Sequence, residues 1–158
     1  MAELVPITPR IAARIDAMSP AAIDQVRRLE SLARGLPQVA IETGHALHAG
    51  LYARTVRVPA GVVITGVLVK IATLLVVDGD VLVHVDDGPP LRLQGHHVLP
   101  AQAGRKQAFF AQADTHITMI FASGATGVAE AEQEFTDEAD LLVSRRDAGS
   151  NRIVNTGE

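Results

Sequence analysis

The sequence predicts an all-β domain, either a sandwich or a barrel, with one helix before it and a short helix or tail after it. Apolar residues recur at helical spacing only as far as Gly35. From Val39 onward, short β-forming runs alternate with glycine and proline turns, and no helical stretch separates them. This order argues against alternating βαβ units. A chain of 158 residues is long enough for one domain with its own core.

The composition excludes several classes of protein. The chain has no cysteine, so disulfide frameworks and cysteine-ligated metal centres are excluded. A formal net charge of −4 gives no general attraction to nucleic acid or anionic lipid. The first ten residues lack the layout of a signal peptide, and charged residues such as Lys70 and Asp78 interrupt the longest apolar runs. We therefore expect a soluble, cytoplasmic protein without nucleic-acid or membrane partners.

The first predicted helix begins at Ser19 and Pro20, an N-cap residue followed by a first-turn proline. Its expected apolar face consists of Ile23, Val26, Leu29 and Ala33. Gly35 and Pro37 end it. A shorter helix is expected to start at Thr8-Pro9. The longer helix is expected to pack over one end or edge of the barrel, or alternatively to bind a partner's groove.

The predicted strands are short and closely spaced. They cover residues 51–58, 62–69, 72–77, 81–86, 91–93, 97–100, 106–111 and 116–122. Asp78-Gly79-Asp80 and residues 87–90 carry strong turn signals, because glycine accepts positive φ and proline fixes the chain direction. Val81 and Val83 alternate with Leu82 and His84, as expected of strands with one face on a core.

The sequence becomes acidic after Gly127, which predicts a solvated helix or loop. A short helix is expected to start at Thr136, with residues 141–143 as its buried face and two arginines at its end. Residues 147–158 have no periodicity, so a flexible tail or one laid on a neighbouring subunit is expected. The predicted organisation is a helical extension (1–38), a β-barrel (39–125) and an acidic helix with a flexible tail (126–158).

The middle of the chain resembles the cupin superfamily over about residues 45–122. In cupins, a first motif runs from glycine through His-x-His and glutamate to glycine, and a second contains proline, glycine and histidine. Here Gly61, Gly79, Pro100 and Gly104 match the glycine and proline positions. The resemblance implies a double-stranded β-helix, or jelly-roll, barrel.

The metal-ligand positions of the cupin motifs are not matched. They hold Val67, Val69, Thr73 and Gln107. A transition-metal site needs at least three converging donors, and valine has no lone pair to give. We therefore predict no metal at this place and no other cofactor.

The order of segments is also similar to small cupin-like proteins of tailed bacteriophages and prophages. That order is a helix, His-x-x-His, Gly-Leu-Tyr-Ala-Arg-Thr, the barrel, an acidic helix and Ser-Arg-Arg. The similarity implies a phage-encoded accessory or virion protein with other phage structural proteins as partners.

Two other groups of residues are candidates for chemistry. His45, His48 and His97 form an alternative, rebuilt metal site, although a surface or capping role is favoured for the first two. Tyr52, Arg54, Arg105 and Gln107 form a candidate ligand site for a carboxylate or phosphate. The competing interpretation is that Tyr52 packs at a barrel end and Arg54 pairs with Glu42 or Asp114.

These observations favour a non-catalytic barrel that acts through protein contacts, as a homo-oligomer and as a structural component of a phage particle. No nucleophile and base stand in a recognisable catalytic context. The alternative is a small-molecule binding protein, or a cupin-type enzyme with a rebuilt site at the barrel mouth. A sensory regulator is the least favoured, because no DNA-binding helix pair is evident.

Overall fold

The computed structural model describes residues 14–86 and 88–157. The short helix expected at Thr8-Pro9 lies outside these residues. In chain order the elements are α1 (Pro20–Ala33), β1 (Thr43–His48), β2 (Leu51–Val58), β3 (Val63–Thr65), β4 (Thr73–His84), β5 (Leu91–Ala101), β6 (Ala108–Ala111), β7 (Thr115–Ala122), α2 (Val128–Phe135), η1 (Ala139–Leu141), α3 (Val143–Arg146), η2 (Ala148–Ser150) and β8 (Asn151–Asn155).

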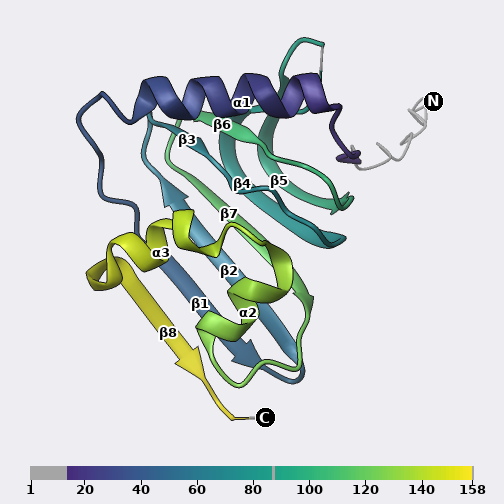
Figure 1. The fold of residues 1–158 in the computed structure, drawn as a ribbon, viewed down its shortest axis with the longest axis vertical. Coiled ribbons are helices and arrows are strands. Elements are labelled where there is room, and N and C mark those ends of the chain that lie inside the picture. Colours follow the sequence, from purple (N-terminus) through teal and green to yellow (C-terminus); the bar gives the residue numbers. More distant parts are fainter. Residues whose placement is uncertain (1–13, 87, 158) are drawn as a thin grey trace, which may run out of the picture.

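The strands of the described residues form one curled sheet, in the order β3-β6-β4-β7-β2-β1-β8, with β5 on the other edge of β4 (Figure 1). All pairings between these strands are antiparallel except that of β1 with β8. The mostly-β composition and the half-barrel curl confirm the predicted all-β class and are consistent with a jelly-roll cupin barrel.

The alternation of side chains explains which face of the sheet covers the core. In β4, Val81 and Val83 are fully buried, as the sequence predicts. Ile117, Met119 and Phe121 of β7 are buried in the same way, while their neighbours face outward. The core therefore lies inside the curl of the sheet, where a cavity can be enclosed.

The turn predicted at Asp78-Gly79-Asp80 is wrong, because β4 runs through it. Gly79 has φ +147°, and a Cβ there would lie 2.4 Å from the Thr115 hydroxyl oxygen. The Asp80 N–H donates to that oxygen at 3.1 Å. At this point β4 changes its partner from β7 to β6. The absence of a side chain at Gly79 allows the backbone of β4 to lie close to Thr115. β5 is likewise one strand, with Gly95 paired opposite Gly79.

Other strand boundaries also differ from the prediction. β3 covers only residues 63–65, and Val69 makes only an isolated bridge to Arg105. β1 is not among the predicted strands, since glycine and two histidines weaken its apolar alternation. It exists because it pairs with β2 through a tight turn at Ala49-Gly50, where both residues have positive φ.

Helix α1 confirms the predicted start, since the Ala22 N–H donates to the Ser19 hydroxyl oxygen at 3.1 Å. The helix lies across one end of the sheet (Figure 1). Its buried residues are Ala22 and Val26, which pack with Met18, Ala108 and Ile23. The apolar face predicted for this helix is wider than the buried face, because Leu29 is 37% exposed.

The C-terminal region differs most from the prediction. The helix in the acidic stretch is α2, which ends before Thr136, and only two 3-10 turns and the short α3 follow among the described helical elements. The solvated stretch expected there instead buries Glu132, which is 2% exposed. The tail forms β8, which pairs in parallel with β1 of the same chain. Within the described residues, none of the helices is long and apolar enough to cross a membrane.

Candidate functional site

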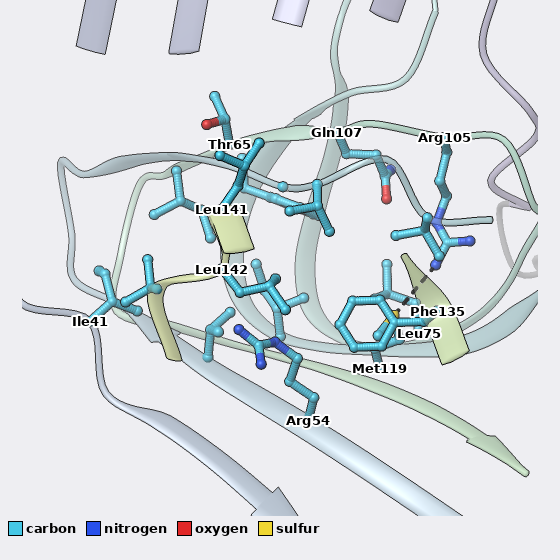
Figure 2. A pocket seen from close by; sticks show the side chains of 18 residues that line it. Ile41, Arg54, Thr65, Leu75, Arg105, Gln107, Met119, Phe135, Leu141 and Leu142 are labelled. Carbon is cyan, nitrogen blue, oxygen red and sulfur yellow. Dashed lines mark hydrogen bonds between the residues drawn. The ribbon is translucent and has the colours of Figure 1, made fainter. Parts of the chain in front are cut away.

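A cavity of about 150 Å³ lies inside the curled sheet (Figure 2). Strands β2, β3, β4, β6 and β7, the segment 66–69, Ile41, Arg105, Gln107 and the C-terminal segment 135–143 provide its wall. The lining is mostly apolar and includes Val67, Val69, Leu75, Ile117, Met119 and Phe135. Three longer polar side chains reach it, those of Arg54, Arg105 and Gln107. An apolar hollow with a few polar groups is the usual form of a small-molecule site.

The structure places around this cavity three of the four residues that the motif resemblance assigns to metal-ligand positions. Val67, Val69 and Gln107 line it. Thr73 does not line it, but its hydroxyl oxygen accepts a 2.6 Å hydrogen bond from Arg105 Nη2. The positions picked from the sequence motifs therefore surround one region of the barrel interior.

These residues do not fit a divalent metal. The valines have no donor atom, and the Thr73 oxygen already accepts a hydrogen bond from a cation. No group of three or more His, Asp or Glu side chains in the described chain could hold a metal ion. The guanidinium of Arg105 also reaches into the region and would repel a second cation.

The histidines of the alternative metal site do not converge. His45 faces inward from β1, whereas His48 on the same strand is exposed and hydrogen bonded to Thr156. His97, in β5, contacts the backbone carbonyl of Gln94 at 2.8 Å. The three side chains therefore serve separate local contacts.

His45 belongs to a buried network that fastens β8 to the sheet. Its Nε2 lies 2.9 Å from Asn151 Oδ1, and its Nδ1 lies 2.7 Å from the Tyr52 hydroxyl. Because the amide oxygen only accepts, Nε2 carries the proton and Nδ1 accepts from Tyr52. Burial lowers the pKa of His45 and raises the pKa of Tyr52 to about 12, so both stay neutral near pH 7.

Tyr52 is not part of the cavity wall. Its ring is fully buried and stacks on Phe135 with 6.4 Å between ring centroids, while Phe121 meets its edge. The structure thus places Tyr52 in the core between β1, β2 and α2, rather than in a ligand site with Arg54, Arg105 and Gln107.

Arg54 lines the cavity, but its charge is compensated. Its Nη1 lies 3.1 Å from Glu132 Oε2 and donates to the hydroxyl oxygen of Ser144, and its guanidinium lies over Phe135. Arg145 holds the other carboxylate oxygen of Glu132 at 3.0 Å. The acid paired with Arg54 is therefore not Glu42 or Asp114. Sequence reasoning missed Glu132 because it lies among several other acidic residues, which together predicted a solvated stretch.

Arg105 differs from Arg54 because no carboxylate of the described residues pairs with it. It is 2% exposed, and its guanidinium donates only to neutral acceptors, the carbonyls of Ile71 and Gln102, Thr73 and the Met119 sulfur. Its Nε has no partner. Burial lowers the pKa of Arg105 to about 10, so it is still a cation at pH 7. A buried, unpaired charge is costly and rare.

Gln107 lines the same cavity and also carries an unsatisfied donor. Its side chain is 5% exposed, and its Nε2 has no hydrogen-bond partner. Figure 2 shows Gln107 beside Arg105, with Ile41 on the opposite side of the pocket. A cation and an amide donor thus meet in an apolar hollow, which is the donor set for one small anion.

Lys106, between these two residues in sequence, points the other way. Its Nζ is fully buried and lies 2.8 Å from Glu30 Oε2 and 2.7 Å from the Gly66 carbonyl oxygen. Lys106 connects α1 to the barrel and takes no part in the cavity.

Comparison with known proteins yields only distant structural likenesses. No family model matches the chain, and no curated protein matches it. Among solved structures, it is similar to a salicylate 1,2-dioxygenase from Pseudoaminobacter salicylatoxidans, at 17% identity and a TM-score of 0.46, over 73% of this chain and 33% of that chain. The chain therefore spans about a third of that enzyme's length.

Two shorter proteins are also similar. A cupin superfamily protein from Desulfitobacterium hafniense matches at 16% identity and a TM-score of 0.45, over 58% of this chain and 87% of that chain. A Streptococcus pyogenes protein of unknown function matches at 13% identity and a TM-score of 0.42, over 56% and 79% of the two chains. One of these three neighbours is named as a cupin, but likenesses at this level bring no activity to the present chain.

Proposed function

We propose that this protein is a non-catalytic, cupin-like barrel that binds a small anionic molecule in its interior cavity. The observation that carries the proposal is the buried, unpaired guanidinium of Arg105. A bound anion would supply its missing counter-charge, and Gln107 would donate a second hydrogen bond from its free Nε2. The cupin metal position would thus hold an anion next to arginine.

A ligand screen by thermal unfolding tests this proposal. Small carboxylates and inorganic phosphate should include a ligand that raises the unfolding midpoint in proportion to the logarithm of its concentration, because binding to the native state stabilises it. Arg105→Met and Gln107→Leu should each abolish or strongly weaken that shift. Arg57→Met removes a half-exposed arginine elsewhere on the sheet and should leave the shift unchanged.

Two results would overturn the proposal. One is a flat response to every anion at millimolar concentration. The other is a midpoint shift of equal size in wild type and Arg105→Met, since general ion effects would then explain it.

We further propose that copies of the chain associate through β8. Ile153 and Val154 of this strand are 57% and 62% exposed, and β8 pairs on only one side within the described chain. An exposed apolar edge strand supports pairing with a second copy. Assembly into a phage particle, with other phage structural proteins as partners, rests on the resemblance described above and remains a prediction.

Native mass measurement tests the association. The wild-type chain should be a dimer or larger at micromolar concentration, and Val154→Lys should shift it towards the monomer, because charge on an edge strand opposes pairing. Arg152→Lys, on the same strand, should keep the wild-type mass. A monomeric wild type at all concentrations would contradict association through β8.

A further inference from the structure

A second hollow, of about 360 Å³, lies outside the first. The end of α1, the segment 36–41, β3 and residues 141–146 line it. The two hollows share Ile41, Ile64, Thr65, Val67, Leu141 and Val143 as wall residues. The outer hollow therefore adjoins the inner cavity along a mostly apolar boundary.

The two hollows differ in the polarity of their far ends. At the inner end, Arg105 and Gln107 present unsatisfied donors, opposite Ile41 in Figure 2. In the outer hollow, Leu36 and Val39 are 65% and 52% exposed, which leaves apolar surface uncovered beside the shared wall. A ligand that satisfies both ends needs an anionic head and an apolar body.

Charge limits the head to a single negative charge. Arg105 is the one cation lining the inner cavity without a carboxylate partner among the described residues, because Arg54 is already neutralised by Glu132. A dianionic phosphate would leave one negative charge unpaired in an apolar hollow, at high cost. In the outer hollow, Glu30 is already paired with Arg34 and Lys106. A carboxylate therefore fits the inner end better than a phosphate does.

Size limits how much of the ligand the inner cavity can hold. An apolar cavity of about 150 Å³ accommodates a molecule the size of benzene. A carboxylate with about three further carbons fills such a space, so a longer body must extend past Ile41 and Leu141 into the outer hollow.

Building on the anion-binding function proposed above, we infer that the ligand is an amphipathic monocarboxylate of medium chain length. Its carboxylate binds Arg105 and Gln107 inside the barrel. Its hydrocarbon chain passes along Ile41, Ile64 and Leu141 to the outer hollow beneath the 36–41 segment. The exposed apolar side chains of Leu36 and Val39 contact the end of that hydrocarbon chain.

Calorimetric titration of the full chain with sodium butyrate and sodium octanoate tests the inference. Each buried methylene strengthens binding by about fourfold, so octanoate should bind at least tenfold more tightly than butyrate. Arg105→Met should lower the affinity for both acids by at least tenfold. Octanol, which has the chain without the charge, should bind more weakly than octanoate.

A substitution in the outer hollow distinguishes the contribution of the ligand's hydrocarbon chain from that of its carboxylate. Val39→Asn changes a half-exposed residue that lines only the outer hollow, so it should lower octanoate affinity severalfold and leave butyrate affinity unchanged. Leu32→Asn is the matched control, because Leu32 is 73% exposed and lines neither hollow; it should change neither affinity.

The outcomes distinguish the two proposals. If butyrate binds in an Arg105-dependent way and octanoate binds no more tightly, the anion site stands and the chain-length inference is overturned. If phosphate binds better than either acid, the monocarboxylate head is wrong while anion binding survives. If none of these anions binds to the wild-type protein, both proposals fail.

Discussion

At the scale of single residues, the buried charges differ in how they are compensated. Glu132 is held by Arg54, Arg145 and the hydroxyl of Ser144. Lys106 is held by Glu30 and a backbone carbonyl. Arg105 alone among these groups has only neutral partners. Since a buried unpaired charge costs stability, Arg105 is the residue on which the proposed anion binding depends.

His45 provides a pH prediction at the same scale. Burial lowers its pKa below the ordinary value of 6.5, so the unfolded chain binds the proton more readily than the folded protein. The stabilisation is complete above pH 6.5 and is lost as pH falls through the lower folded pKa. The free energy of unfolding should therefore decrease between pH 7.5 and 5, and His45→Gln should flatten this decrease.

Urea unfolding at several pH values provides the measurement. Leu32→Gln is the control, because Leu32 is exposed and carries no titratable group, so this variant should keep the wild-type pH dependence. Parallel pH profiles for wild type and His45→Gln would show that His45 does not titrate differently in the two states.

At the scale of elements, the N-cap of α1 is a local device with a measurable effect. Ser19→Ala removes the acceptor for the Ala22 N–H and should lower the free energy of unfolding by about 1 kcal/mol. Ser31→Ala, at an exposed position in the same helix, should change it by less than about 0.5 kcal/mol. Equal effects of the two substitutions in chemical denaturation would contradict the capping role.

Strand β8 is an element that depends on long-range contacts. A chain ending at Ser150 would lose the pairing of β1 with β8 and the Asn151 contact to His45. We expect lower stability and faster hydrogen exchange for β1 amides, because these losses uncover one edge of that strand. The amides of β7, which lies between β4 and β2, should be less affected and serve as the internal control. Unchanged exchange in β1 would contradict this account.

At the scale of the whole molecule, the anion-binding proposal predicts that the barrel interior does not bind a transition metal. Adding Mn²⁺ or Zn²⁺ at about 100 μM should leave the thermal unfolding midpoint unchanged, because Val67 and Val69 offer no donor and Arg105 repels cations. A metal-dependent rise that persists in His48→Gln and is lost in Gln107→Leu would contradict this prediction.

Sequence patterns predicted the elements that carry strong local signals. The helix start at Ser19-Pro20, strand 51–58 and the alternation of β7 all follow from capping or period-two patterning. Sequence patterns gave the wrong structure where a local turn signal competed with long-range strand pairing. Asp78-Gly79-Asp80 looks like a hairpin turn, yet it is a point of close approach inside a twelve-residue strand.

The sequence by itself determined the all-β class and the absence of imidazole and carboxylate ligands at four motif positions, because strand period and side-chain chemistry are local properties. Only the tertiary structure decided which charges are compensated. Glu132 comes from 78 residues beyond Arg54 to neutralise it, and no carboxylate of the described chain does the same for Arg105. Whether a buried charge has a partner depends on packing across the sheet, which no spacing along the chain encodes.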